Sequence, residues 1–76
     1  MRDVQVSSEA IGRRLKQLRV ESGLTQLELS HRVGASPQQI HRYEAGRQDV
    51  KAAVLWRLCE AMHTDVNGFF RGFGRP

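Results

Sequence analysis

The chain carries two short helix signals in succession within residues 25–46, each with its own start and its own stop. In the first, Thr25 caps the helix, and Glu28, three residues later, completes a capping box that satisfies two backbone N–H groups. Gly34 then ends the helix, because glycine adopts the left-handed conformation of a helix end with little strain. The first signal therefore predicts a helix over residues 26–33.

The second signal follows after a tight turn at residues 34–37. Ser36 caps this helix, Pro37 occupies its first position, and Gln39 is expected to complete a second capping box. The helix ends before Gly46. Two short capped helices separated by a glycine turn are the layout of a unit whose second helix reads another molecule.

Two longer helices are predicted on either side of this pair. Ser7 or Ser8 can cap the first, which reaches to about residue 22 with apolar residues at spacings of three and four. Asp49 is expected to cap the other, over about residues 50–62. The apolar stripes of these two helices predict their core-facing side chains, which are Ile11, Leu15, Leu18, Val54, Leu55, Leu58, Cys59 and Met62.

The end of the chain completes an all-α organisation. Asp65 is expected to open a short last helix that runs through Phe70. No segment alternates with period two, so strands are not expected. We therefore predict a compact five-helix domain over residues 9–70, with a flexible N-terminal arm at residues 1–8 and a C-terminal tail at residues 71–76.

Composition limits the classes of protein to be considered. A chain of 76 residues makes one domain at most. Its single cysteine, Cys59, excludes an intrachain disulfide and fits a reducing cytoplasm, where we expect the protein to reside. A formal net charge of +4 favours an anionic partner, either nucleic acid or an anionic membrane surface. No long apolar run or signal peptide is present, so membrane insertion is not expected.

The predicted helix that starts at Pro37 has two different faces. At about 100° per residue, the inward side of the wheel carries Ile40, Tyr43 and Glu44. The opposite side and its flanks carry Gln38, Gln39, His41, Arg42 and Ala45. Glutamine can pair with adenine, and arginine with guanine, through two hydrogen bonds each. By itself this pattern is more typical of a solvated helix face, but the capped helix before it and the net positive charge favour a surface that reads DNA.

Five segments of the chain resemble the helix-turn-helix family of the phage repressor and Cro type, often called the XRE family. They are IGRRLKQLR, GLTQLELSHRVG, SPQQIHRYEAG, VLWRLCEAM and DVNGFF. The resemblance covers nearly the whole chain apart from its two ends. It implies a five-helix, lambda-repressor-like domain that binds operator DNA, usually as a dimer, with the helix-turn-helix at the second and third helices. The chain departs from the family at Ser30, where alanine is usual, and at Val50, where proline is common. It departs again at His63 and Thr64, where glycine and an apolar residue are frequent.

The resemblance also implies roles for particular residues. The positions that read bases are Gln38, Gln39 and Arg42, with Pro37 and His41 at their edge. The positions that contact phosphates are Gln26, Arg47, Gln48 and Lys51, and we expect Arg13 and Arg14 of the first helix to add to them. Arg19 and Glu44 match a partly buried salt bridge that joins the first and third helices.

The aromatic residues are concentrated in the last third of the chain. Phe69 and Phe70 are expected to close the core, and Trp56 either covers its rim or anchors a subunit interface. The candidates for a dimer interface are Trp56, Phe69, Phe70 and Phe73. A single module would bury little surface on DNA, so we expect a homodimer that binds a palindromic operator in double-stranded DNA.

Other kinds of site find less support. The spacing of His31, His41, His63 and Cys59 matches no metal motif, and no cofactor is expected. No set of nucleophile, base and acid is visible, so we do not expect an enzyme. The principal alternative is a protein-interaction module, such as an antitoxin that docks a partner protein, and RNA binding is a third. An interaction module would expose apolar residues where the third helix exposes polar ones.

Overall fold

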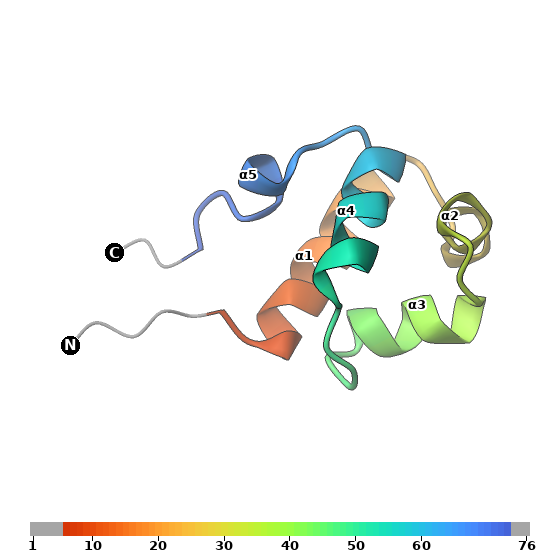
Figure 1. Cartoon of the computed structure of the whole chain (residues 1–76), viewed down its shortest axis with the longest axis horizontal. Coiled ribbons are helices and arrows are strands. Elements are labelled where there is room, and N and C mark those ends of the chain that lie inside the picture. The colour runs from red at the N-terminus through yellow and green to blue at the C-terminus, as the bar shows by residue number, and fades with distance from the viewer. Residues whose placement is uncertain (1–5, 74–76) are drawn as a thin grey trace.

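The computed structural model describes residues 6–73, which form five helices and contain no strand. The helices are α1 (Ser8–Glu21), α2 (Gln26–Val33), α3 (Pro37–Glu44), α4 (Ala52–Ala61) and α5 (Val66–Phe69) (Figure 1). This confirms the predicted all-α, five-helix fold. Part of the predicted arm (residues 1–5) and part of the predicted tail (residues 74–76) lie outside the described residues.

The start and stop signals of the first two helices act as predicted. Ser7 caps α1, since its hydroxyl accepts a hydrogen bond from the N–H of Ala10 at 3.1 Å. At the start of α2, the Thr25 hydroxyl accepts from the N–H of Glu28 at 3.0 Å, and the Glu28 carboxylate accepts from the N–H of Thr25 at 2.9 Å. The pKa of Glu28 is lowered, chiefly because the bond from the Thr25 N–H to its carboxylate favours the ionised form. Gly34 ends α2 in the left-handed conformation, with φ at 72°.

The predicted second capping box is wrong in its reverse half. Ser36 accepts from the N–H of Gln39 at 3.1 Å, as expected. The Gln39 side chain, however, runs along α3 and donates from Nε2 to the hydroxyl of Tyr43 at 2.8 Å. Because Tyr43 is only 2% exposed, its hydroxyl requires a protein partner, and Gln39 supplies one.

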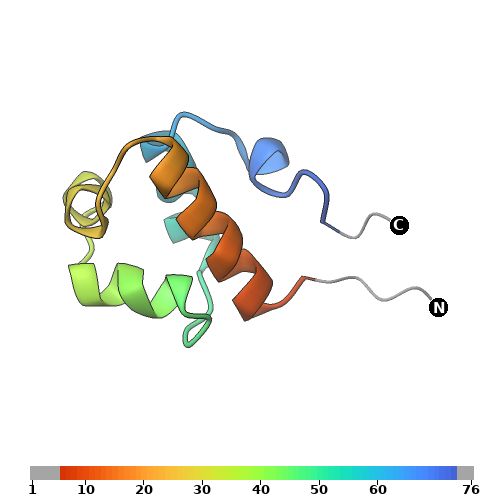
Figure 2. The same ribbon diagram turned by 180° about the vertical axis from the view of Figure 1, so that it is seen from behind.

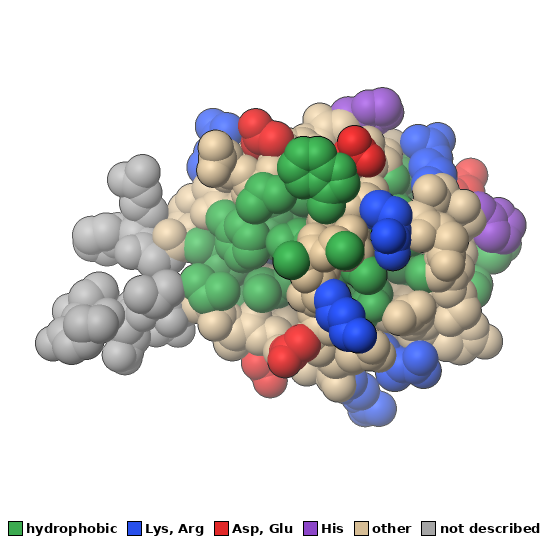
Figure 3. All heavy atoms as spheres, in the orientation of Figure 1, with side chains coloured by type: hydrophobic (Ala, Val, Ile, Leu, Met, Phe, Trp, Pro, Cys, Tyr) green, Lys and Arg blue, Asp and Glu red, His purple; other side chains and the backbone are tan. Residues whose placement is uncertain are grey.

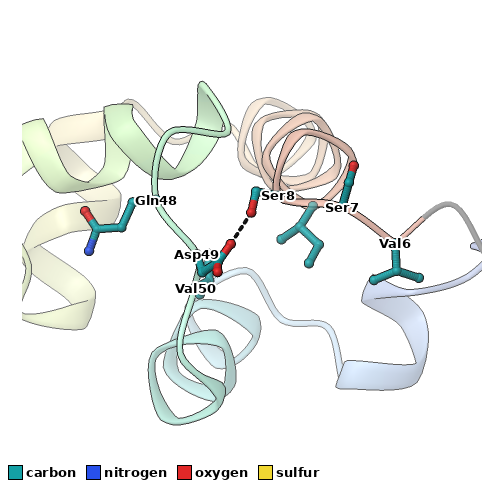
Figure 4. A pocket seen from close by; sticks show the side chains of 7 residues that line it. Val6, Ser7, Ser8, Gln48, Asp49 and Val50 are labelled. Carbon is teal, nitrogen blue, oxygen red and sulfur yellow. Dashed lines mark hydrogen bonds between the residues drawn. The ribbon is translucent and has the colours of Figure 1, made fainter.

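The predicted start of α4 is also wrong. The helix begins at Ala52, and Lys51 occupies the cap position without a side-chain hydrogen bond. Asp49 does not cap it, because its carboxylate accepts a hydrogen bond from the hydroxyl of Ser8 (Figure 4). The predicted start is about two residues too early because the bond between Asp49 and Ser8 of α1 is a tertiary contact, which local sequence does not reveal.

A single core lies between the helices. Its buried apolar side chains are Leu15, Leu29, Val33, Ile40, Tyr43, Leu58, Cys59, Met62 and Phe69. Ser30, where the family usually has alanine, is fully buried, and its hydroxyl donates to the carbonyl of Leu27 at 2.6 Å. The predicted stripes of the first and fourth helices are confirmed, because their members are either buried or packed against this core.

Helix α3 is held from two sides. It packs against both α1 and α2, and α1 also contacts α5 (Figure 2). At the crossing of α1 and α3, a Cβ atom on Gly12 would lie 2.4 Å from the carbonyl oxygen of Tyr43 and 2.7 Å from that of Glu44. Only glycine allows this approach, so Gly12 determines how closely the C-terminal end of α3 lies against α1.

Candidate nucleic-acid interface

The outer face of α3 is polar and uncovered. Gln38, His41 and Arg42 are exposed, whereas Ile40 is fully buried and Tyr43 nearly so. The helix lies along one edge of the molecule, and the loop that follows it turns beneath the same edge (Figure 1). The inward and outward sets of side chains agree with the helical wheel.

Two side chains on this helix are held by hydrogen bonds that they donate to neighbouring residues. Gln39 is tied to Tyr43, as described above. Arg42 donates from Nε to the side-chain oxygen of Gln48 at 3.3 Å, which leaves the two terminal nitrogens of its guanidinium group for other partners. Gln48 extends away from the neighbouring Asp49 side chain (Figure 4).

Arg19 and Glu44 form an ion pair between α1 and α3. Arg19 Nε lies 2.6 Å from Glu44 Oε2, and Arg19 Nη2 lies 3.0 Å from Glu44 Oε1. The two side chains are 11% and 4% exposed, and Arg19 Nη1 also donates to the carbonyl of Leu24. Gln26, at the start of α2, donates to Glu44 Oε1 at 3.0 Å. One carboxylate on α3 therefore binds side chains from both helices that support it.

Arg14, which was expected to contact phosphate, is hydrogen-bonded within the fold. Its guanidinium group donates from Nε to the carbonyl of Phe69 and from Nη2 to the carbonyl of Gly68, both at 2.8 Å. The last carbonyls of a helix have no partner within the helix, and Arg14 satisfies two of them in α5. The adjacent Arg13 is exposed, so these two arginines have different environments.

The loop between α3 and α4 carries four exposed polar or charged residues, which are Arg47, Gln48, Asp49 and Lys51. Its first part is pressed against the start of α1, where a Cβ atom on Gly46 would lie 2.8 Å from the Cα of Glu9. Farther along, Ser8 and Asp49 face each other across a hollow between α1 and the loop (Figure 4). The loop is thus attached to α1 on both sides of Arg47.

The aromatic residues near the end of the chain divide into buried and exposed members. Phe69 is fully buried, so its prediction as a core residue is correct and its place among the dimer-interface candidates is wrong. Phe70 packs against the core and meets Phe69 and Phe73 edge to face, with ring centroids 5.0 and 5.2 Å away. Trp56 is 59% exposed. On the face of the molecule that Figure 3 shows, hydrophobic side chains gather over α4 and α5.

Three further observations concern the cysteine, possible metal ligands and possible membrane-spanning helices. Burial raises the pKa of the Cys59 thiol, which lowers its reactivity. Within residues 6–73, no three His, Cys, Asp or Glu residues gather closely enough to hold a metal ion. In the same range, every helix is too short or too polar to cross a membrane.

The sequence is similar to a helix-turn-helix family and to individual proteins of that kind. A sequence model of the helix-turn-helix domain matches residues 10–68. An uncharacterised transcriptional regulator in the ATPase CF(0) region of Rhodospirillum rubrum is 35% identical over 65 residues, covering 86% of this chain and 60% of the relative. Multiprotein-bridging factor 1 of Candida albicans is 34% identical over 67 residues, covering 88% and 43%. The chain therefore spans 60% or less of the length of these two curated relatives.

Solved structures share the fold closely. The clp gene regulator ClgR from C. glutamicum superposes with a TM-score of 0.83 at 27% identity, over 93% of this chain and 91% of that one. The restriction-modification controller protein C.AhdI from Aeromonas hydrophila gives 0.79 at 25% identity, over 83% and 96%. On these matches and the geometry of α2 and α3, the chain belongs to the XRE-type helix-turn-helix family of DNA-binding transcriptional regulators.

Proposed function

We propose that this chain binds operator DNA sequence-specifically, with α3 in the major groove and α2 across the backbone. The observation that carries the proposal is the outer face of α3, which presents amide and guanidinium groups while its apolar side chains are buried. Such groups match the hydrogen-bonding edges of bases in the major groove. The residues proposed to read bases are Gln38, Gln39 and Arg42, with Pro37 and His41 at the edge of the contact.

A second set of residues is proposed to bind phosphates without reading sequence. It comprises Gln26, Arg47, Gln48, Lys51 and Arg13. Gln26 lies in the first turn of α2, where free backbone N–H groups favour an anion. Arg47 and Lys51 are exposed in the loop between α3 and α4, and in this pose they would bring positive charge to the DNA backbone. Contacts of this kind supply affinity and register, and base contacts supply specificity.

We further propose that the working form is a homodimer on a palindromic operator. One domain of this size covers only about 600–1,000 Å² of its own surface on DNA. Two domains related by a two-fold axis would read half-sites about 34 Å apart. The surface proposed for this pairing contains Trp56, Phe70 and Phe73, which lie on α4 and after α5.

Selection of bound sequences from random double-stranded DNA, using the purified protein, tests the proposal directly. A palindromic consensus with half-sites one helical turn apart is expected. Failure to enrich any sequence would contradict sequence-specific binding, and a single unpaired half-site would contradict the dimer alone.

Two matched arginine variants test the division of roles. Arg42→Ala should relax preference at one base pair by about 1–3 kcal/mol. Arg47→Ala should weaken binding to all sequences alike and reduce the slope of log affinity against log salt by about one unit. Equal losses on all sequences for both variants would show that Arg42 does not read bases.

The second candidate function is a protein-interaction module, such as an antitoxin that docks a partner. The exposure of Trp56 favours it, and so does the name multiprotein-bridging factor 1 carried by three of the relatives. The two functions differ in their need for the outer face of α3. If the purified protein had no affinity for any DNA at low salt, the interaction module would be preferred.

A further inference from the structure

The hydroxyl of Tyr43 joins the protein core to the outer face of α3. The Tyr43 side chain is buried with the core residues and only 2% exposed. Its hydroxyl accepts a hydrogen bond from the side-chain nitrogen of Gln39 at 2.8 Å, one turn earlier on the same helix. Gln39 is partly exposed at the start of α3, between the buried tyrosine and the outer face.

This hydrogen bond leaves a defined part of the Gln39 amide free. The amide nitrogen carries two hydrogens, and Tyr43 takes one of them. When Tyr43 takes the hydrogen anti to the carbonyl oxygen, the second N–H and that oxygen remain as a donor and an acceptor side by side. Adenine offers the matching acceptor and donor in the major groove, at N7 and at the N6 amino group. The same edge is mismatched to guanine, which presents two acceptors there.

We propose that Tyr43 is a positioning residue for base specificity, acting through Gln39 to favour adenine at one base pair of each half-site. The inference rests on the proposed function, because it requires α3 to lie in the major groove. Tyr43 itself is buried and does not touch DNA. Its hydroxyl fixes the Gln39 side chain during folding, so that less rotamer freedom is lost when DNA binds. Arg42, by comparison, is held by the exposed Gln48, a less rigid support.

The experiment compares wild type, Gln39→Ala and Tyr43→Phe on the selected operator and on its single-base-pair variants. Gln39→Ala identifies the base pair concerned, where wild type should prefer adenine by roughly 5- to 150-fold. Tyr43→Phe should abolish most of that preference and leave preferences at the other base pairs within about twofold of wild type. A merely structural role for Tyr43 would instead weaken binding to every sequence by the same factor.

Two additions keep the result interpretable. In the Gln39→Ala background, Tyr43→Phe should cause no further change at that base pair, because its effect passes through Gln39. If Tyr43→Phe does not fold, nuclear magnetic resonance of the wild-type protein replaces it. The side-chain amide protons of Gln39 should then show cross-relaxation with the ring protons of Tyr43, and its absence would overturn the inference.

The outcomes separate this inference from the function on which it rests. If wild type selects no DNA sequence, both are overturned. If wild type is selective but Tyr43→Phe keeps the full preference at the base pair that Gln39→Ala identifies, only the role of Tyr43 is overturned. A Gln39→Ala variant with unchanged preferences at every base pair would also overturn it.

Discussion

His63 is the only non-glycine residue within residues 6–73 that has a positive φ, at 57°. It follows Met62, the C-cap of α4, and the N–H of the next residue, Thr64, bonds back to the carbonyl of Cys59 at 2.9 Å. Residues with a Cβ atom are strained in this left-handed conformation by roughly 1–2 kcal/mol, whereas glycine is not. The glycine that the family often has at this position therefore has a conformational reason.

Replacing His63 by glycine should stabilise the protein. The relief of backbone strain exceeds the extra entropy that glycine gives the unfolded chain, and the net gain should be about 0.5–1 kcal/mol. Urea unfolding of wild type and His63→Gly would measure it. Glu60→Gly is the matched control, because Glu60 is exposed within the regular part of α4, and it should cost about 1 kcal/mol. A loss of stability in both variants would show that strain at His63 is negligible.

For single residues, the sequence correctly predicts whether a side chain is buried or exposed wherever the period of one helix decides it. The wheel separated buried Ile40 and Tyr43 from exposed Arg42 because their placement depends on helical period alone. It could not foresee the partners of Arg14, because they are carbonyls of α5, more than fifty positions away in the chain. It misassigned Gln39 because two local partners competed, and only the burial of Tyr43 decides between them.

Among the elements, α2 has the most complete local signals, and its predicted bounds agree with the structure. Helix α4 was predicted to start too early because Asp49 bonds to Ser8, forty-one positions away. A helix start can thus be read from sequence where both partners of the cap are local. It cannot be read where tertiary packing engages the capping residue elsewhere.

The capping box of α2 should make stability depend on pH. The Glu28 pKa lies below its ordinary value of 4.5 in the folded state, chiefly because of the hydrogen bond from the Thr25 backbone. Its contribution to stability is therefore fully present above pH 4.5 and is lost as the pH falls through the lower, folded pKa. The stability difference between wild type and Glu28→Gln, measured by thermal unfolding from pH 7 to pH 3, should shrink in that range.

Thr25→Ala provides the corresponding control for the capping box. It removes the hydroxyl, which accepts from the N–H of Glu28 and is the second contribution that lowers the Glu28 pKa, but it keeps the larger one, the bond from the Thr25 N–H to the carboxylate. Its pH dependence should therefore fall between those of wild type and Glu28→Gln. If Glu28→Gln and wild type kept a constant difference down to pH 3, the box would contribute nothing through the charge of Glu28.

The contact between α1 and α3 should couple stability to DNA binding. In Gly12→Ala the new methyl group would meet two backbone oxygens of α3, so α3 must move away, at a cost of about 1–3 kcal/mol. Operator affinity should fall because the reading face is displaced. Gly23→Ala is the matched control, since its Cβ would have no neighbour within 4 Å although its φ is +75°. Gel shifts at a temperature where both variants are folded should show a loss of affinity for Gly12→Ala alone.

For the whole molecule, the relevant feature is where the proposed DNA-binding surface on α3 lies relative to the proposed pairing surface on α4 and α5. Helix α3 lies at the lower right edge of the fold, whereas the hydrophobic side chains over α4 and α5 gather to its upper left in the same orientation (Figures 1 and 3). A subunit could therefore pair through α4 and α5 while α3 remains free for DNA. The sequence predicted an aromatic surplus near the end of the chain, but only the fold separates buried Phe69 from exposed Trp56.

Trp56 should contribute more to self-association than to the stability of one subunit. Its side chain is 59% exposed, so Trp56→Ala removes little core packing, and the unfolding of a single subunit should be almost unchanged. A tryptophan at the centre of an interface commonly contributes 2 kcal/mol or more, so the dimer dissociation constant should rise by at least about tenfold. Leu27→Ala is the matched control, because Leu27 is 52% exposed on α2 and is not part of the surface proposed for pairing. Sedimentation equilibrium should show weaker association for Trp56→Ala and wild-type association for Leu27→Ala, and equal effects of the two changes would exclude this surface as the interface.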